Sequence, residues 1–269
     1  MESVADRFNI KPFSTYANVE VGITTGANSY FTVPEVTVLK YDMQKYARPM
    51  VGRSVQVESL IFTQNDWINN IKSGANANLL VFSDSDALDL NKGAKEYVLW
   101  GEEQGVNRGY KTGIRNNWFV IPSVKLSEAL FIRRNNLYPK LVSNEANAYT
   151  TDTMHRVYIK DSTDRSAFIA SYYNSLSFAF AEIVGRSYGG GVLELLPSEV
   201  KNIPIPYKET HKELLSEVDR MMRSKTNTDA ILSVTDNIIL KEGFGLSEKE
   251  IKIANSIWKK LSNRRLNRL

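Results

Sequence analysis

Cysteine is absent from the 269-residue sequence. Its absence excludes disulfide bridges, cysteine-ligated zinc and cysteine nucleophiles, and because it fits a reducing compartment we expect a cytoplasmic protein. Histidine is scarce, with His155 and His211 the only two. His155 has no second histidine at metal-ligand spacing, and no Gly-x-Ser-x-Gly motif accompanies either residue. The sequence therefore predicts neither a metal site nor a Ser-His-Asp hydrolase.

Long apolar runs are also missing. No run is long enough to span a bilayer, and the N-terminal residues lack the basic-then-apolar pattern of a secretion signal, so we expect no membrane partner. Hydrophobic residues make up 42% and aromatic residues 10% of the chain, which is typical of one or two folded domains. The net charge of +4 permits an anionic partner without requiring one.

Hydrophobic periodicity predicts an α+β fold. Alternating apolar and polar residues predict strands at residues 19–23 and 30–33 around a tight turn at residues 24–28. Helical spacing predicts helices over residues 63–73 and 94–103. Further strands are predicted at residues 79–82, 118–121, 129–132, 140–142 and 154–159. We expect these strands to form a twisted mixed or antiparallel sheet with flanking helices.

The chain changes character after the Pro204-Ile205-Pro206 segment. Before it, Asp164 is placed to cap a strongly apolar helix over residues 164–184. We predict a recognition domain over residues 1–206 and a C-terminal helical segment over residues 207–269. That segment contains three helical patterns, at residues 208–223, 229–241 and 247–266.

Several blocks of the sequence together carry a resemblance to a known family. They are residues 21–31, 47–53, 109–122, 151–157, 174–176, 185–199 and 258–265. In this order they resemble the C-terminal target-recognition region of gamma-class N6-adenine DNA methyltransferases, the TaqI-like and type IIG restriction-modification group. The resemblance implies that the chain recognises a specific sequence in double-stranded DNA.

The catalytic half of that family is not matched. It carries a glycine-rich cofactor loop and an Asn-Pro-Pro-Tyr/Phe motif, whereas this sequence has no Asn-Pro dipeptide. Glycines 189–191 follow a predicted helix instead of a strand, unlike a cofactor loop. The resemblance therefore implies a fragment or split subunit that is not an enzyme by itself. S-adenosylmethionine is expected on a separate catalytic methyltransferase domain or subunit, and a nuclease domain is a further candidate partner.

The strongest candidates for DNA contact are Lys111, Arg115, Asn116 and Asn117. Lysine and arginine bind phosphates, and arginine and asparagine also form paired hydrogen bonds with guanine and adenine edges. The structural alternative is a strand in which Trp118 belongs to the core and the polar neighbours are merely solvated.

The remaining predicted contacts lie in loops, at the start of a strand and beside the glycines. They are Thr24, Thr25, Asn28, Arg53, Thr151, Thr153, His155, Arg156, Arg186, Ser187 and Tyr188. Each group has a structural alternative: a hairpin turn for residues 24–28, a hydrogen-bonded core histidine for His155, and a cation that interacts with a helix dipole for Arg186.

Two other interpretations fit parts of the sequence. Glu199-Val200-Lys201 matches half of a nuclease centre, but a helix that starts at Pro197-Ser198-Glu199 explains the same residues. The second hypothesis for the function is a protein-interaction or specificity-subunit module. Its helices from residue 208 onward would dock a separate methyltransferase or nuclease.

Overall fold

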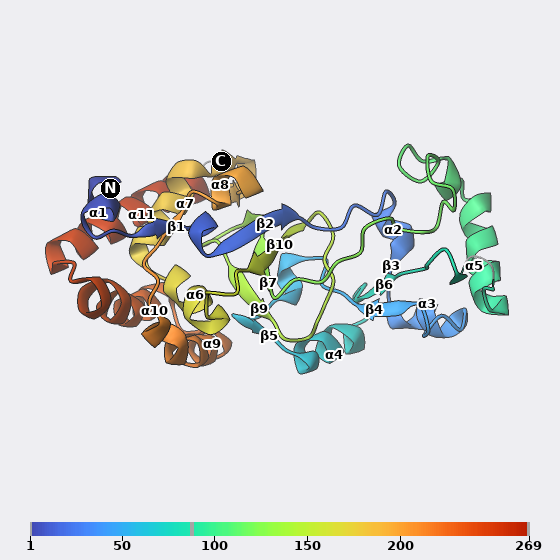
Figure 1. The fold of residues 1–269 in the computed structure, drawn as a ribbon, viewed down its shortest axis with the longest axis horizontal. Coiled ribbons are helices and arrows are strands. Elements are labelled where there is room, and N and C mark those ends of the chain that lie inside the picture. Colours follow the sequence, from blue (N-terminus) through green and yellow to red (C-terminus); the bar gives the residue numbers. More distant parts are fainter. Residues whose placement is uncertain (1, 87–88, 268–269) are drawn as a thin grey trace.

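A five-stranded sheet lies between a helical end and a smaller second lobe (Figure 1). The computed structural model describes residues 2–86 and 89–267. The strand order is β2-β10-β7-β9-β5, antiparallel except for the parallel β5–β9 pair. The strands are β2 (Ala17–Val21), β5 (Ile61–Phe62), β7 (Ala129–Ile132), β9 (Leu141–Asn144) and β10 (Met154–Ile159). The predicted α+β fold with a mixed sheet is confirmed.

The sheet is covered on both faces. Along β7, Ala129 and Phe131 belong to the main hydrophobic core, while Leu130 and Ile132 belong to a separate core. Successive side chains of a strand point to opposite faces, so these two cores lie on the two sides of the sheet. A strand that is buried on both faces reads as a continuous apolar run, which is the pattern of residues 129–132.

Two helices replace the single helix predicted over residues 164–184. They are α6 (Arg165–Tyr172) and α7 (Ser175–Val184), and both belong to the main core. Asp164 caps α6 as predicted, accepting a hydrogen bond from the Ala167 amide at 2.8 Å. The break occurs because Asn174 has an extended backbone, with φ −151° and ψ 160°, and its side chain caps α7.

The three helical patterns predicted after residue 207 are present. They are η6 (Glu209–Glu213) with α9 (Leu214–Arg223), α10 (Thr228–Thr235) with η7 (Asp236–Gly243), and α11 (Glu248–Leu266). Leu215, Leu240 and Trp258 from these helices share the main core with the sheet. The division into residues 1–206 and 207–269 does not coincide with a boundary of this core and stays a prediction.

The N-terminal segment also joins this end of the molecule. It contains α1 (Glu2–Arg7), β1 (Lys11–Pro12) and η1 (Phe13–Thr15). β1 pairs with β13 (Pro204–Ile205), so the first residues lie beside the segment that precedes the C-terminal helices. The helix α8 (Pro197–Val200) leads into that segment.

The second lobe has its own three-stranded sheet, β3-β6-β4. Its elements are α2 (Asn28–Phe31), β3 (Thr32–Val33), α3 (Glu35–Lys40), β4 (Ala47–Pro49), β6 (Asn78–Leu80), α5 (Lys92–Glu103) and η4 (Val106–Arg108). Aromatic rings fill its core: Tyr30 stacks on Tyr97 with centroids 4.7 Å apart, and lies 5.0 Å from Trp118. η2 (Ser54–Gln56) and α4 (Gln64–Lys72) connect this lobe to the central sheet (Figure 1).

Two strand predictions in this lobe are wrong. Residues 30–33 do not form a hairpin with β2, because Tyr30 and Phe31 lie in α2 and β3 pairs with β6. Residues 118–121 form no strand, and only an isolated bridge joins Val120 to Phe82. Their apolar character reflects burial in the aromatic core and not sheet pairing.

Glycines 189–191 form the turn of a hairpin. They connect β11 (Arg186–Tyr188) to β12 (Val192–Glu194), and β12 also pairs with β8 (Arg134–Asn135). Gly190 and Gly191 have φ values of 71° and 72°, a region that favours glycine. Because the run joins two antiparallel strands, its geometry differs from a cofactor loop between a parallel strand and a helix.

Arg265 on α11 holds this hairpin turn in place. Its guanidinium donates to the carbonyl oxygens of Gly191 and Asn136, the latter at 2.6 Å. The same group forms a bidentate pair with Glu182 of α7, at 2.6 and 3.1 Å. The Arg265 and Glu182 side chains are only 2% and 3% exposed, so the ion pair ties α7, α11 and the hairpin together inside the protein.

We predict that Arg265→Ala lowers the free energy of unfolding by about 3–5 kcal/mol, since Glu182 would remain as a buried charge without its partner. Denaturant unfolding measures this loss. Arg264→Ala is the matched control, because Arg264 is exposed on the same helix and should change stability little. Equal stability of the two variants would contradict the assigned role of Arg265.

Candidate nucleic-acid interface

A polar hollow at the far end of the second lobe brings together five of the predicted contact residues. We call it the distal hollow; its volume is about 610 Å³. The predicted residues that line it are Thr24, Lys111, Arg115, Asn116 and Asn117. The turn after β2 and the segment after η4 therefore meet here, although about 90 residues separate them in the sequence.

Lys111, Thr24 and Asn116 are exposed to solvent in this hollow. Within the part of the chain that the structure describes, Lys111 forms no ion pair. Asn117 donates its side-chain amide to Asp84 at 2.9 Å, and Asp84 is the acidic residue among the described residues that line the hollow. Because it is exposed and has no ion pair among the described residues, the ammonium group of Lys111 is available to an anionic partner.

Arg115 has a different role from its neighbours. Its guanidinium donates to the carbonyl oxygens of Thr25 at 2.7 Å and Trp118 at 3.3 Å, and lies 5.9 Å from the Phe31 ring centroid. Burial lowers the pKa of Arg115, but an arginine still stays charged at neutral pH. Arg115 therefore holds the turn and the segment together, and only its remaining donors are left for a DNA contact.

A second hollow lies at the junction between the second lobe and the central sheet. We call it the central hollow; its volume is about 500 Å³. It brings together four predicted residues, Asn28, Arg53, Thr151 and Thr153. None of the described residues that line it is acidic.

Hydrogen bonds position the polar groups in the central hollow. Thr153 donates to the Gly52 carbonyl at 2.8 Å, and Asn28 donates to Asp152 at 3.0 Å. The Gln56 side chain accepts from the backbone amides of Gly52 and Arg53, both at 2.8 Å. Sequence reasoning missed Gln56, whose only signal was its place three residues after Arg53. The exposed Arg53 side chain belongs to none of the ion pairs among the described residues.

Thr25 and His155 are structural residues. The Thr25 side chain is buried and donates to the Asn28 amide oxygen at 2.5 Å. His155 is completely buried, and its Nε2 lies 2.7 Å from the Leu195 carbonyl oxygen. Burial lowers the pKa of His155, which favours the neutral imidazole. Side-chain contact with DNA, as predicted for both residues, does not agree with this burial.

Arg156 is also held inside the protein. It is 9% exposed, donates to the Val21 carbonyl at 3.2 Å and pairs with Glu20 at 3.2 Å. These contacts join β10 to β2 and account for the residue without a ligand. Alternation along a strand places His155 and Arg156 on opposite faces of β10, and the burial of both shows that both faces are covered.

The β11–β12 hairpin presents the last predicted group. Arg186, Ser187 and Tyr188 are exposed, and Arg186 pairs with Glu199 at 2.7 Å. Beside them, Arg133 and Arg134 both pair with Glu194 at 3.0 Å. These three arginines face two carboxylates, so the group keeps an excess of positive charge. Arg133 and Arg134 were not predicted, although adjacent arginines were a visible signal.

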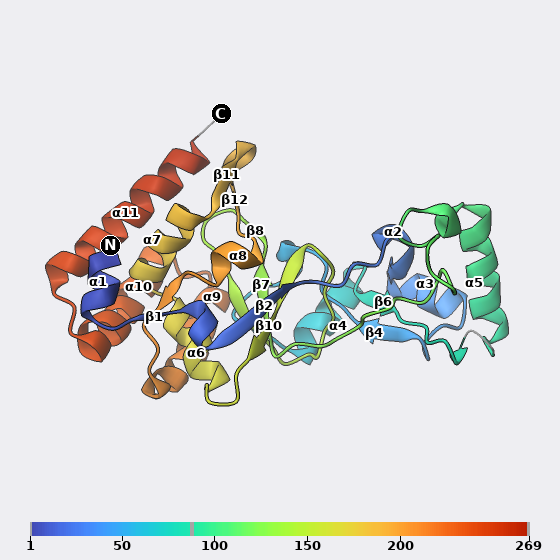
Figure 2. The same ribbon diagram turned by 45° about the horizontal axis from the view of Figure 1, so that its top comes forward.

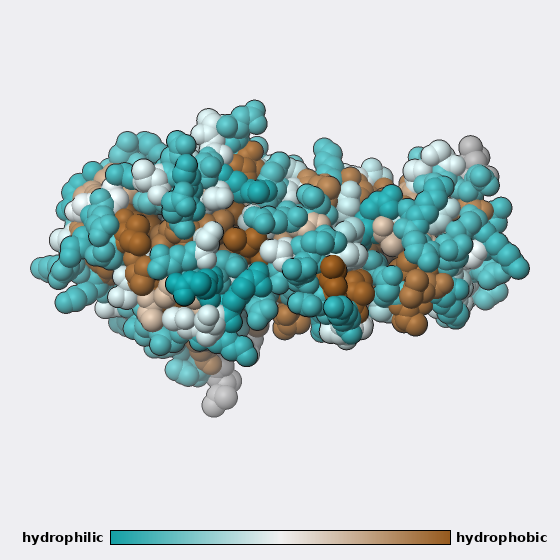
Figure 3. All heavy atoms as spheres, turned by 90° about the horizontal axis from the view of Figure 1, so that it is seen from below, coloured by the Kyte–Doolittle hydropathy of each residue, from teal (hydrophilic) through white to brown (hydrophobic). Residues whose placement is uncertain are grey.

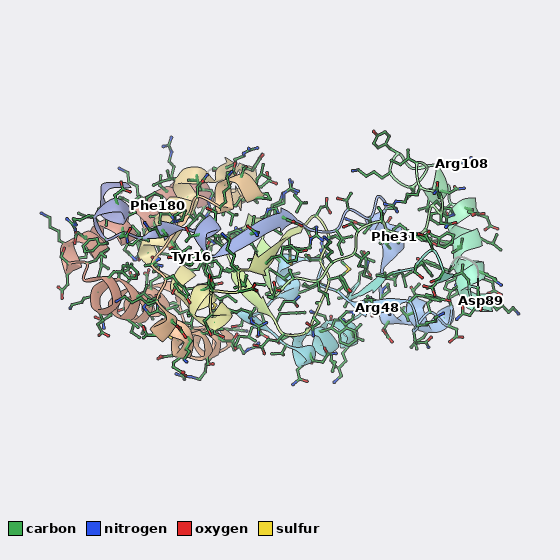
Figure 4. All side chains as sticks on the ribbon, in the orientation of Figure 1. Tyr16, Phe31, Arg48, Asp89, Arg108 and Phe180 are labelled. Carbon is green, nitrogen blue, oxygen red and sulfur yellow. The ribbon has the colours of Figure 1, made fainter. Side chains whose placement is uncertain are left out.

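The hairpin and the segment after α5, which lines the distal hollow, project from the same side of the molecule. Figure 2 shows β11 and β12 rising beside the helical half of the molecule, the segment after α5 at the opposite end, and β2 and β10 between them. Figure 4 places Arg108, which sequence reasoning also missed, at the tip of the second lobe. Arg108 is exposed.

Comparison with known proteins shows which family has this arrangement. Residues 1–240 match the family model of the type II methyltransferase M.Eco57I, C-terminal domain. The chain belongs to this family. The resemblance inferred from the sequence blocks is thereby confirmed, and the chain is a C-terminal domain of the kind found in methyltransferases of restriction-modification systems.

This family member is similar to a longer methyltransferase. It is 24% identical over 244 residues to the type II methyltransferase M.AccI of Acinetobacter calcoaceticus, a match that covers 86% of this chain and 44% of that protein. The chain therefore spans less than half the length of this relative.

Two solved structures resemble the family member in fold. The type IIG restriction endonuclease BpuSI matches with a TM-score of 0.61 and 12% identity, over 98% of this chain and 33% of that one. The type IIL restriction-modification enzyme MmeI, solved in complex with DNA, matches with a TM-score of 0.51 and 11% identity, over 95% of this chain and 33% of that one. At such identities the likeness concerns the fold alone.

Within residues 2–86 and 89–267 of the family member, no three or more histidines, cysteines or acidic residues gather closely enough to hold a metal ion. None of the helices found there combines the length and the apolar character that crossing a membrane requires.

We predict that Arg115→Ala speeds amide hydrogen exchange across residues 106–118, because it removes the hydrogen bonds to Thr25 and Trp118. Hydrogen bonds to charged groups contribute about 1.5–3 kcal/mol, so the free energy of local opening should fall by a similar amount. Hydrogen-exchange mass spectrometry measures it. Lys111→Ala in the same segment should leave exchange unchanged; faster exchange in both variants would show that Arg115 has no special positioning role.

Proposed function

We propose that this chain is the specificity domain of an N6-adenine DNA methyltransferase in a restriction-modification system. It recognises a specific sequence in double-stranded DNA, while methyl transfer and S-adenosylmethionine binding belong to a catalytic domain outside this chain. The relatives support this proposal, because they are methyltransferases and restriction-modification enzymes of which the chain spans only a part.

One observation supports DNA recognition above the others. Cations without an ion pair among the described residues stand beside amide and hydroxyl groups in two hollows: Lys111 with Asn116, and Arg53 with Asn28 and Thr153. Lysine and arginine neutralise phosphates and fix the register of a protein on the duplex. Asparagine and threonine side chains reach base edges, where sequence is read.

The exposed hairpin extends this surface. Tyr188 and Ser187 stand next to Arg186, with Arg133 and Arg134 on the neighbouring strand and loop. The hairpin and the segment after α5 project from the same side (Figure 2), so we infer that a duplex lying across β2 and β10 contacts both. We therefore assign phosphate anchoring to both ends and base recognition to the distal and central hollows.

We predict that Lys111→Ala and Arg53→Ala each weaken duplex binding and reduce the slope of log K against log salt by about 1, as expected for the loss of one phosphate contact. A selection from a random duplex library first gives the preferred site, and titrations at several salt concentrations then give the slopes.

Lys40→Ala is the control for these titrations. Lys40 is equally exposed but lies on α3, on the lower side of the molecule in Figure 1, so its slope should equal that of the unmodified chain. An unchanged slope for Lys111→Ala and Arg53→Ala would remove both residues from the interface. A chain that selects no sequence from the library would contradict the proposed function.

A second candidate function is docking to a separate methyltransferase or nuclease. It is favoured by a hollow of about 610 Å³ on α11, where the half-exposed Ile253 is surrounded by Lys249, Lys252 and Lys260. Removing residues 207–269 would not test it cleanly, because Leu215, Leu240 and Trp258 belong to the main core. Ile253→Glu changes only the surface.

We expect Ile253→Glu to reduce co-purification with a co-expressed catalytic methyltransferase domain and to leave duplex affinity unchanged. Asn263→Glu on the same helix adds the same charge at an exposed position outside the hollow and is the matched control. If Ile253→Glu abolishes duplex binding as well, α11 belongs to the DNA interface and not to a docking surface.

A further inference from the structure

Two large apolar side chains are exposed to solvent beside the distal hollow. Tyr110 is 85% exposed and Ile114 is 76% exposed, although both belong to a short segment between buried residues. Ile114 lines the hollow, and Lys111 lies between the two. Neither side chain contributes to the aromatic core of the second lobe, so packing does not explain them.

The segment that presents them is internally braced. Thr112 is completely buried, and its hydroxyl donates to the Val106 carbonyl at 2.5 Å and the Gly109 carbonyl at 3.2 Å. The Gly113 amide donates to the Gly109 carbonyl at 2.7 Å. A loop with these contacts keeps its shape, so Tyr110 and Ile114 are presented to solvent by a preformed turn.

The segment also rests against the turn at residues 24–28. A Cβ atom on Gly26, whose φ is 83°, would come within 2.9 Å of the Lys111 Cβ, so the two backbones approach closely. Arg115 locks the same contact through the Thr25 carbonyl. A side chain that enters another molecule needs such a rigid support, because it is pushed back by the groups that it separates.

The charges around the two apolar residues fit a polyanion. The exposed cations Arg108 and Lys111 lie on either side of Tyr110 in the sequence. Two nearby carboxylates are held by neighbouring side chains: Glu102 accepts from the Trp118 indole at 3.0 Å, and Asp84 accepts from Asn117 at 2.9 Å. Neither forms an ion pair with Arg108 or Lys111 among the described residues. Apolar side chains between phosphate-binding cations are the composition of a wedge that unstacks a base step.

We propose that Tyr110 and Ile114 form a wedge that enters a groove of the bound duplex and opens a base step, while Arg108 and Lys111 hold the phosphates on either side. The inference rests on the proposed function and deepens it. Opening a step costs stacking energy that depends on the bases, so the wedge also contributes to sequence selectivity.

The test uses the full chain and a duplex selected from the random library. The adenines are replaced one at a time by 2-aminopurine, whose fluorescence rises on unstacking, and dyes on the duplex ends report bending. We expect one position to brighten severalfold and the end-to-end distance to shorten on binding. In the double variant Tyr110→Ser/Ile114→Ser both signals should be lost, and affinity should fall roughly tenfold or more, as for a lost base–aromatic stack.

The matched control is Val36→Ser/Leu39→Ser on α3, which removes two comparably exposed apolar groups far from the distal hollow and should keep both signals. Equal melting temperatures of all variants verify that folding is preserved. A duplex that binds in its site without bending or unstacking, or a double variant that retains both signals, would overturn the wedge while leaving DNA recognition intact. Failure of the unmodified chain to select any site would instead remove the proposed function, and the wedge with it.

Discussion

The rest of the structure depends on a central sheet whose strands are buried on both faces. Leu130 and Phe131 of β7 belong to different cores, so a shift of one residue would exchange the two sets of side chains. The need to keep each set of side chains in its own core sets the register of β7 against β10, and β10 pairs in turn with β2. β2 leads to the turn at residues 24–28, and β10 begins beside Thr151 and Thr153. The polar groups of both hollows are therefore placed by the register of an apolar sheet.

Several arginines in this protein connect elements inside the fold. Arg265 joins two helices to the glycine turn, and Arg115 joins the two loops of the distal hollow. Arg223 pairs with Asp66 and Asp219 and donates to the Ile61 carbonyl at 2.7 Å, which links α9 to α4 and β5. Net charge is consequently a poor guide to the binding surface. The informative cations are Lys111 and Arg53, which are exposed, form no ion pair among the described residues and line the two hollows.

The two sides of the molecule also differ. The lower face shows hydrophobic patches interrupted by hydrophilic residues (Figure 3), whereas the projecting hairpin and the segment after α5 rise from the opposite side.

Long helices such as α5 and α11 were predictable because their periodicity is a local property. Residues 118–121 were misread because Trp118 and Phe119 pack into an aromatic core, which apolar runs cannot distinguish from a strand.

The sequence alone indicated the family, the α+β class, the helix cap at Asp164 and the segments that form the site. These features could be read from it because motifs and periodicity are local. Only the tertiary structure decided which residues face a partner. Arg115, Arg156 and His155 look equivalent to Lys111 and Arg53 in sequence, yet their partners lie on segments dozens of residues away. Burial and pairing depend on contacts between such segments, and a single sequence does not encode them in any local pattern.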